Sequence, residues 1–174
     1  RGAMAQALVI DDPNAASIAP ILDRGRDAAI AADRLVLAGS RVWGKVAEVG
    51  QHTCTVKRTT DAGYRDLVQL ATPREDQLQF VARGVLVGQG TLLCKIEQVE
   101  TTEPIAIGDL AFTVDDGVVD APLLYGRVVR LGRKPGQAHW EIWLEPAVPA
   151  ALPPAHVAVL KMELNPTRIA VVPQ

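Results

Sequence analysis

The sequence predicts an all-β protein built from two small barrels. Short runs rich in Val, Leu, Ile and Thr follow one another along the chain, and Gly, Pro or Asp bounds each run. The runs begin about ten residues apart, as in β-sandwiches and barrels. The stretch VWGKVAEVG, residues 42–50, is also matched by LYGRVVRLG, residues 124–132. No long amphipathic helix is indicated.

Twelve strands are expected, and each is recognised by β-branched or alternating residues between turn residues. In chain order they cover residues 7–10, 17–22, 34–38, 42–49, 53–58, 64–70, 78–87, 91–99, 110–114, 123–131, 139–144 and 156–163. The alternation is clearest near the end, where Ile142 and Leu144 are expected on the face opposite Trp143. Residues 23–33 are expected to form one or two helical turns, with Asp27 as a candidate N-cap.

The matched stretches belong to a longer repeated unit. Each unit has an acidic turn, a short strand, a connection, and a strand with an early glycine. Asp33 opens the first unit and Asp109 opens the second. A glycine inside a strand commonly marks a bend or bulge where a small barrel curls, so Gly44 is expected to serve curvature. Two unequal units indicate two related barrels rather than a stacked repeat array.

The domain boundaries follow from turn and proline content. We expect residues 1–4 to be an expression scar, 5–73 the first barrel and 74–148 the second barrel, divided near the polar stretch 71–76. Residues 149–165 are expected to be a proline-rich linker with a returning strand that can join either barrel, and 166–174 a loose tail.

Composition excludes several functions. The net charge is −2, so a nucleic-acid partner has no electrostatic support. No run reaches the length and apolarity of a membrane span. No motif for a cofactor and no metal-ligand spacing is found, so neither cofactor nor metal is expected. Cys54 and Cys94 both lie in strand patterns and are interpreted as buried thiols, with a disulfide as the alternative.

Catalytic residues are hard to place in this chain. The two serines, Ser17 and Ser40, lie in no nucleophile motif. Cys54 and His52 are two residues apart on one strand, which leaves a degenerate or cysteine-type hydrolase as an alternative function. That pair would need an orienting carboxylate supplied by the fold, because none is nearby in sequence.

Aromatic residues on charged strand faces are the candidate partner-binding residues. Trp43 is expected on the same face as Lys45, and Trp143 lies between two glutamates. Such an aromatic can anchor a protein partner. The alternative is that the other barrel or a loop covers this face.

Two segments resemble the rod shape-determining protein MreC family. They are ILDRGRDAAIAADRLVLAGSRVWGKVAEVGQHTCTVKRTTD, residues 21–61, and IGDLAFTVDDGVVDAPLLYGRVVRL, residues 107–131. The match extends over nearly all of the globular chain. The sequence departs from the family pattern at Ala29, often Gly, at Cys54, often Ser, and at 113–117, where the family often shows T-S-G. These departures fall in turns and one strand, and leave the expected fold intact.

The resemblance implies more than composition does. It implies two barrels arranged like those of chymotrypsin-type proteases without their catalytic residues, in the extracytoplasmic region of a single-pass inner-membrane protein with a coiled coil. It implies a scaffold of the cell-elongation machinery that binds penicillin-binding protein 2, associates with MreD, MreB and RodA, and self-associates. The rivals are the hydrolase above and a periplasmic adaptor of a transport complex.

Overall fold

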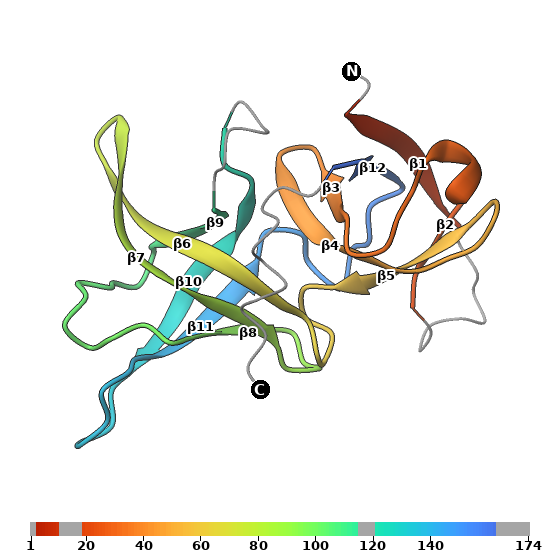
Figure 1. The fold of residues 1–174 in the computed structure, drawn as a ribbon. Helices are drawn as coiled ribbons and strands as arrows, with labels where there is room; N and C mark the ends of the chain where they lie inside the picture. The colour runs from red at the N-terminus through yellow and green to blue at the C-terminus, as the bar shows by residue number, and fades with distance from the viewer. Residues whose placement is uncertain (1–2, 11–18, 115–120, 163–174) are drawn as a thin grey trace.

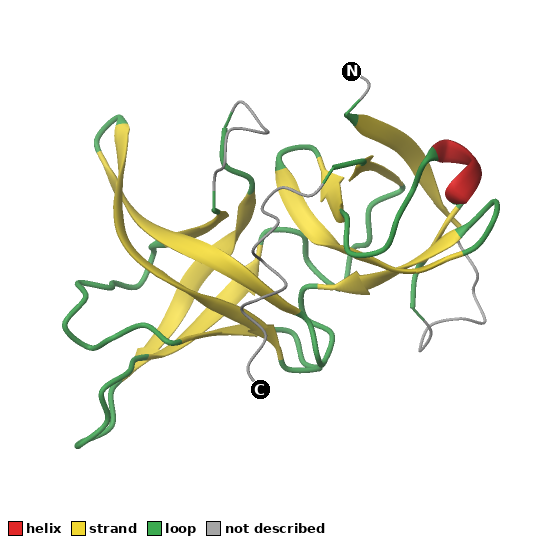
Figure 2. Cartoon of the chain, in the orientation of Figure 1, coloured by secondary structure: helices red, strands yellow, loops and turns green. Residues whose placement is uncertain are grey.

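The computed structural model describes residues 3–10, 19–114 and 121–162, which form an all-β fold (Figure 2). All twelve expected runs contain a strand. Their bounds are β1 Met4–Ile10, β2 Ile21–Leu22, β3 Leu35–Ala38, β4 Arg41–Val49, β5 Cys54–Arg58, β6 Arg65–Arg74, β7 Gln77–Gly88, β8 Cys94–Glu97, β9 Leu110–Thr113, β10 Leu124–Gly132, β11 Glu141–Pro146 and β12 His156–Leu160. Residues 163–165 of the expected returning strand and the expected tail, 166–174, lie outside the described ranges.

The first barrel is a closed ring of six strands (Figure 1). Its pairs run from β1 through β2, β5, β4, β3 and β12 back to β1. The returning strand β12 therefore joins the first barrel, where it lies between β1 and β3. This placement brings the end of the described chain beside its beginning, with Lys161 donating a backbone hydrogen bond to Ala3.

The second barrel is another closed ring of six strands. Its pairs run from β6 through β7, β8, β11, β10 and β9 back to β6. One parallel contact, Leu124 with Arg41, connects β10 to β4 of the first barrel. Closing both sheets leaves few unpaired strand edges, which removes the usual route to edge-to-edge aggregation.

The expected domain boundary differs from the observed one. The change of barrel falls between β5, which ends at Arg58, and β6, which begins at Arg65. The stretch 71–76 lies at the end of the β6–β7 hairpin, where Pro73 pairs with Leu78. A polar, proline-containing stretch marks a hairpin end as well as a linker, because proline is tolerated where a strand leaves the sheet.

The repeated stretches form corresponding strands, β4 and β10. A bulge falls at Trp43 in β4 and at Tyr125 in β10. In each strand the bulged residue comes directly before the glycine that the two stretches share. A second irregularity follows Val46 in β4 and Val128 in β10. The backbone of Val46 exchanges two hydrogen bonds with residues 33 and 34, as that of Val128 does with 108 and 109. The repeated sequence therefore gives the same local backbone geometry in the two barrels.

Both glycines of the repeat are required by close backbone contact. A Cβ atom at Gly44 would lie 2.2 Å from the Lys57 carbonyl oxygen, and one at Gly126 would lie 2.1 Å from that of Glu145. Neither position has a positive φ. The glycines thus admit a facing carbonyl where the strand bends, which confirms the curvature role expected for Gly44.

Two apolar clusters fill the fold. One lies within the first barrel and contains Val36 and Trp43. The other fills the second barrel and continues onto Leu35 and Leu37 of the first. Neighbouring residues of β3 therefore pack into different barrels, and the whole strand is buried. This shared strand joins the barrels through apolar packing.

The expected helical turn is shorter than predicted. Only Arg26–Ala28 form a 3₁₀ helix, η1. Asp27 lies inside this helix and does not cap it, so the N-cap assignment was wrong. The single turn ends at Ala29, which adopts a left-handed conformation with φ 62°. Glycine adopts that conformation at the least cost, so the alanine at this position is a strained residue of the turn.

Candidate interaction surfaces

Trp43 is buried in the first barrel, so it cannot be an exposed partner anchor. Its exposed fraction is 2%. The bulge places Trp43 opposite the gap between Leu37 and Val36, which breaks the alternation along β4. In a bulge two successive side chains turn to one side, so Trp43 leaves the face of Lys45. The expectation that Trp43 and Lys45 share a face was therefore wrong.

Lys45 lies between the two barrels. Its Nζ atom donates a hydrogen bond of 2.7 Å to the carbonyl oxygen of Arg65 and lies 3.8 Å from Oδ1 of Asp66. It also lies 5.1 Å from the centroid of the Tyr64 ring. Only 17% of its side chain is exposed. Lys45 thus contacts the second barrel. This agrees with the alternative given above, in which the other barrel covers this strand face.

The partner of Lys45 belongs to a buried polar network in the second barrel. The Asp66 carboxylate accepts hydrogen bonds from the Tyr125 hydroxyl and from the backbone N–H of Leu67. The Tyr64 hydroxyl lies 2.8 Å from the Tyr125 hydroxyl oxygen, to which it donates because Tyr125 donates to Asp66. Such a network fixes the geometry of the groups that form it. It holds the two barrels in one relative position.

Trp143 lies on the outer face of the second barrel, as the alternation in β11 predicted. Its neighbours Ile142 and Leu144 are fully buried. Two cations flank the indole ring: Lys95 Nζ is 4.9 Å and the Arg130 guanidinium carbon 4.6 Å from its centroid. These cation–π contacts stabilise the outer face. Whether Trp143 binds a partner stays a prediction.

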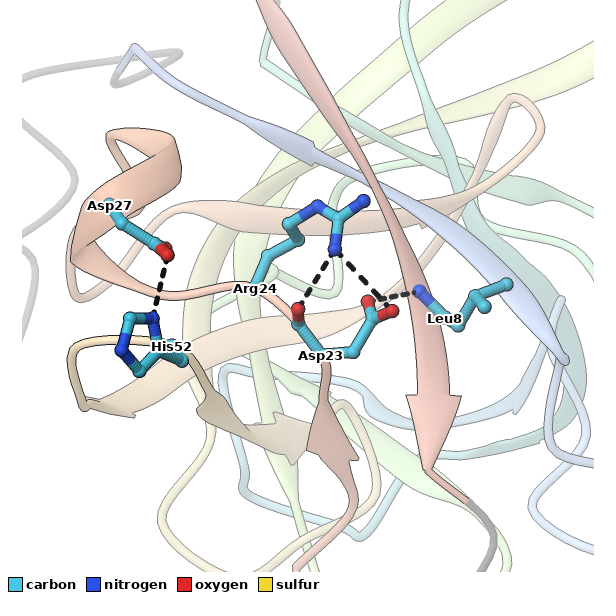
Figure 3. A network of polar contacts seen from close by, with 5 residues as sticks. All are labelled: Leu8, Asp23, Arg24, Asp27 and His52. Carbon is cyan, nitrogen blue, oxygen red and sulfur yellow. Dashed lines mark hydrogen bonds and ion pairs between the residues drawn. The ribbon is translucent and has the colours of Figure 1, made fainter.

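The cysteine-hydrolase alternative fails on the position of Cys54. The fold does supply a carboxylate for His52, because Asp27 Oδ2 lies 2.8 Å from Nδ1 of His52 (Figure 3). The hydrogen bond from His52 is the main cause that lowers the pKa of Asp27. His52 is exposed, however, whereas Cys54 is buried inside the first barrel. Desolvation raises the pKa of Cys54 to about 11, so the thiol is protonated at neutral pH.

The thiols give a pH-dependent prediction. Both cysteines are free and buried, and burial raises each pKa from 9.0 to about 11. Neither should react with a disulfide reagent at pH 8 in the folded protein, and both should react in urea. Because the folded pKa is the higher one, their contribution to stability is present below pH 9 and falls as the pH rises from 9 to 11. Thiol titration and urea unfolding against pH measure both effects, and rapid labelling at pH 8 would contradict the burial.

One apolar surface lies on the outer face of β1. The exposed positions of this strand are Met4, Gln6, Leu8 and Ile10, so the polar Gln6 separates Met4 from the apolar pair. Met4, Leu8 and Ile10 are 36%, 47% and 44% exposed. The Asp23 carboxylate fixes the strand by accepting a hydrogen bond of 2.7 Å from the backbone N–H of Leu8 (Figure 3). Arg24 in turn donates to the Asp23 carbonyl oxygen. We call the exposed residues of this strand the β1 face; its apolar part is Leu8 and Ile10, and the backbone at Leu8 is held by Asp23.

A groove forms a second apolar surface, mainly on the second barrel, beside the connection to β12 and Arg41 of the first barrel. Its volume is about 750 Å³. Its lining is mostly leucine, proline and alanine, with Arg41, Arg127 and Glu145 as the charged residues. Leu92, at one end, is 72% exposed. We call this site the groove; its apolar lining residues include Leu92, Leu93, Leu110, Leu124, Pro146 and Pro149.

The third apolar surface is the end of the β6–β7 hairpin, which projects from the second barrel (Figure 1). Leu78 and Phe80 are 41% and 48% exposed there, and Phe80 packs edge-on against Phe112 with ring centroids 6.2 Å apart. The turn carries Arg74, Glu75 and Asp76. We call residues 74–80 the hairpin tip.

Sequence reasoning missed these three surfaces. It took alternating apolar residues as core residues, and in most strands they are. Their only signal was the pattern of β1, where Leu8 and Ile10 alternate with the smaller Ala7. Burial of Ala7 rather than Leu8 depends on which face of β1 points into the closed barrel, and that is a property of the fold.

Among the described residues, no three His, Cys, Asp or Glu side chains are grouped to hold a metal ion. No helix in the described ranges is long and apolar enough to cross a membrane. The described chain is thus a pair of closed barrels with exposed apolar surfaces, and the class that it defines is an all-β double-barrel protein.

Comparison with known proteins identifies the family. The model of the rod shape-determining protein MreC barrel core matches residues 8–160. The chain therefore belongs to the MreC family, whose members determine cell shape. A comparison with curated proteins finds no match.

Solved structures share the fold. MreC from Pseudomonas aeruginosa superposes with a TM-score of 0.72 at 22% identity, over 90% of this chain and 98% of that one. MreC of Listeria monocytogenes gives 0.74 at 20% identity, over 94% and 79%. The major periplasmic domain of the cell shape-determining filament MreC gives 0.65 at 19% identity, over 90% and 93%. At these identities the likeness shows the double-barrel fold.

Proposed function

We propose that the chain is the extracytoplasmic part of a non-catalytic scaffold in the bacterial cell-elongation complex, which synthesises peptidoglycan. The observation that carries this proposal is the apolar β1 face on an otherwise closed barrel, because soluble monomers rarely group large exposed apolar side chains without a partner. Family membership supports the role in cell shape. A single membrane helix and a coiled coil, elsewhere in a longer protein, would hold the barrels at the inner membrane.

The partner we propose for the β1 face is the ectodomain of penicillin-binding protein 2. Binding would stabilise one conformation of that enzyme through higher affinity for it, and in this way a protein without catalysis regulates wall synthesis. MreD, MreB and RodA would join through the assembled complex. Self-association would array several enzymes along one scaffold, as the word filament in the name of one structural relative suggests.

The test is a pull-down of the purified ectodomain by the wild-type chain and by a Leu8→Thr and Ile10→Thr double variant. Threonine keeps strand propensity and removes apolar area, so the variant should fold and bind at least about tenfold more weakly. Ile107→Asp is the matched control, because it changes an exposed aliphatic residue outside all three apolar surfaces and should leave binding unchanged. Equal binding by all three proteins would exclude the β1 face, and no binding by the wild type would reject this partner.

A further inference from the structure

We infer that the groove binds the hairpin tip of a second copy of this chain. This inference rests on the self-association in the proposed function and names the two surfaces that would produce it. The hairpin tip is a narrow apolar projection with Leu78 and Phe80 exposed, and the groove is a concave apolar site of about 750 Å³. A projecting apolar side chain and a complementary pocket elsewhere on the same molecule give a contact between copies.

The charges of the two surfaces are complementary. The tip carries Glu75 and Asp76 with one arginine, so it has one negative charge in excess. In the groove Arg127 pairs with Glu145 at 3.4 Å, and Arg41, which donates a hydrogen bond to the Ala147 carbonyl oxygen, is the positive charge in excess. The acidic residues of the tip form no ion pair with another residue in the described ranges. Docking would give these carboxylates their first cationic partners and favour a second copy over an uncharged apolar ligand.

The tip is held away from the groove of its own molecule by a stiff hairpin. Leu110 of the groove pairs with Ala71 of β6, three residues before Arg74 of the tip. From Ala71 onward β6 and β7 stay paired up to Arg74 and Gln77, which keeps the hairpin extended past the start of β9. A paired hairpin does not fold back onto its own strands, so the occupant that we propose comes from another molecule.

Two disabled variants test the inference by complementation. The tip variant, Leu78→Thr with Phe80→Thr, loses the projecting apolar side chains and keeps strand propensity. The groove variant, Leu92→Asp with Arg127→Glu, places negative charge where the acidic tip would bind. Ile107→Asp is the control, because Ile107 is an exposed aliphatic residue, 64% accessible, outside both surfaces. Far-UV circular dichroism and urea midpoints establish that each variant is folded.

Sedimentation equilibrium measures the association of each protein and of their mixtures. The wild type and the Ile107→Asp control should self-associate, and each disabled variant alone should do so at least about tenfold more weakly. An equimolar mixture of the two variants should form a 1:1 complex, because it contains one intact tip and one intact groove. This recovery requires that the tip of one copy meets the groove of another.

Three results would overturn the inference, and they leave different parts of the proposed function in place. Variants that associate as strongly as the wild type, or a mixture that stays monomeric, would show that self-association uses other surfaces. Loss of penicillin-binding protein binding in the groove variant, with self-association unchanged, would assign the groove to that enzyme. A wild type that stays monomeric up to about 1 mM would reject the inference, and the pull-down above would still decide partner binding.

Discussion

Lys45→Ala is expected to lower the free energy of unfolding by about 3 kcal/mol or more. The substitution leaves the Asp66 carboxylate, whose side chain is fully buried, without the cation 3.8 Å away. It also removes the hydrogen bond to the Arg65 carbonyl oxygen. Removing one partner of a buried pair costs more than the pair contributes, because the remaining charge stays buried. Urea unfolding followed by the fluorescence of buried Trp43 measures the loss.

A double-mutant cycle separates the pair from its surroundings. Asp66→Asn should also destabilise, and Lys45→Met combined with Asp66→Asn should cost less than the two single changes added together, because no uncompensated charge remains. Arg24→Ala is the control, since the Arg24–Asp23 pair is exposed and should contribute less than about 1 kcal/mol. A loss below 0.5 kcal/mol for Lys45→Ala, on the order of a surface change, would show that the contact between barrels does not need this pair.

Gly126→Ala is expected to destabilise the protein by about 3 kcal/mol, through overpacking against the backbone. The added Cβ would meet the Glu145 carbonyl oxygen at 2.1 Å, and that oxygen belongs to a paired strand that cannot move alone. Gly44→Ala should have a similar effect through the Lys57 carbonyl oxygen. If the glycine allows the same bend in both strands, the two substitutions should lower the free energy of unfolding by similar amounts.

The matched control for these changes lies on the same strand. Gly132 ends β10, and the nearest atom to an added Cβ there is 3.6 Å away, an ordinary contact distance. Gly132→Ala should therefore leave stability unchanged within about 0.5 kcal/mol, or raise it slightly by reducing the freedom of the unfolded chain. Thermal and urea unfolding of the three variants compare the positions directly. Equal losses at Gly126 and Gly132 would mean that steric overlap is not the cause.

The position of Lys45 bears on the function proposed above. Its contacts, together with the apolar packing of Leu35 and Leu37, fix one barrel against the other. The β1 face lies on the first barrel, and the groove and the hairpin tip lie on the second. A fixed relation between barrels therefore fixes the relation between these surfaces. Loosening the barrels should weaken simultaneous binding of two partners before it weakens binding of either one.

Local pattern predicted the elements well, because strand formation here follows alternation and turn residues. The His139–Glu145 region shows this, since Ile142 and Leu144 are buried as the alternation requires. The alternating pattern predicted the wrong strand face where a bulged residue interrupts the alternation. The bulge at Trp43 turns that side chain into the first barrel, and periodicity cannot locate a bulge that depends on the facing strand. The boundary was misplaced for another reason, because a polar stretch with a proline marks a hairpin end as well as a linker.

The sequence by itself determined an all-β chain of twelve strands, two related units and glycines at their bends, because these depend on residues close together in the chain. Only the tertiary structure decided which strands close each barrel, that β12 returns to the first, and that Lys45 reaches Asp66 of the second. It also decided which apolar residues stay outside, as for Leu8 and Phe80. The physical reason is that burial and pairing are set by neighbours distant in sequence, and each strand face acquires its role only when another strand covers it or leaves it open.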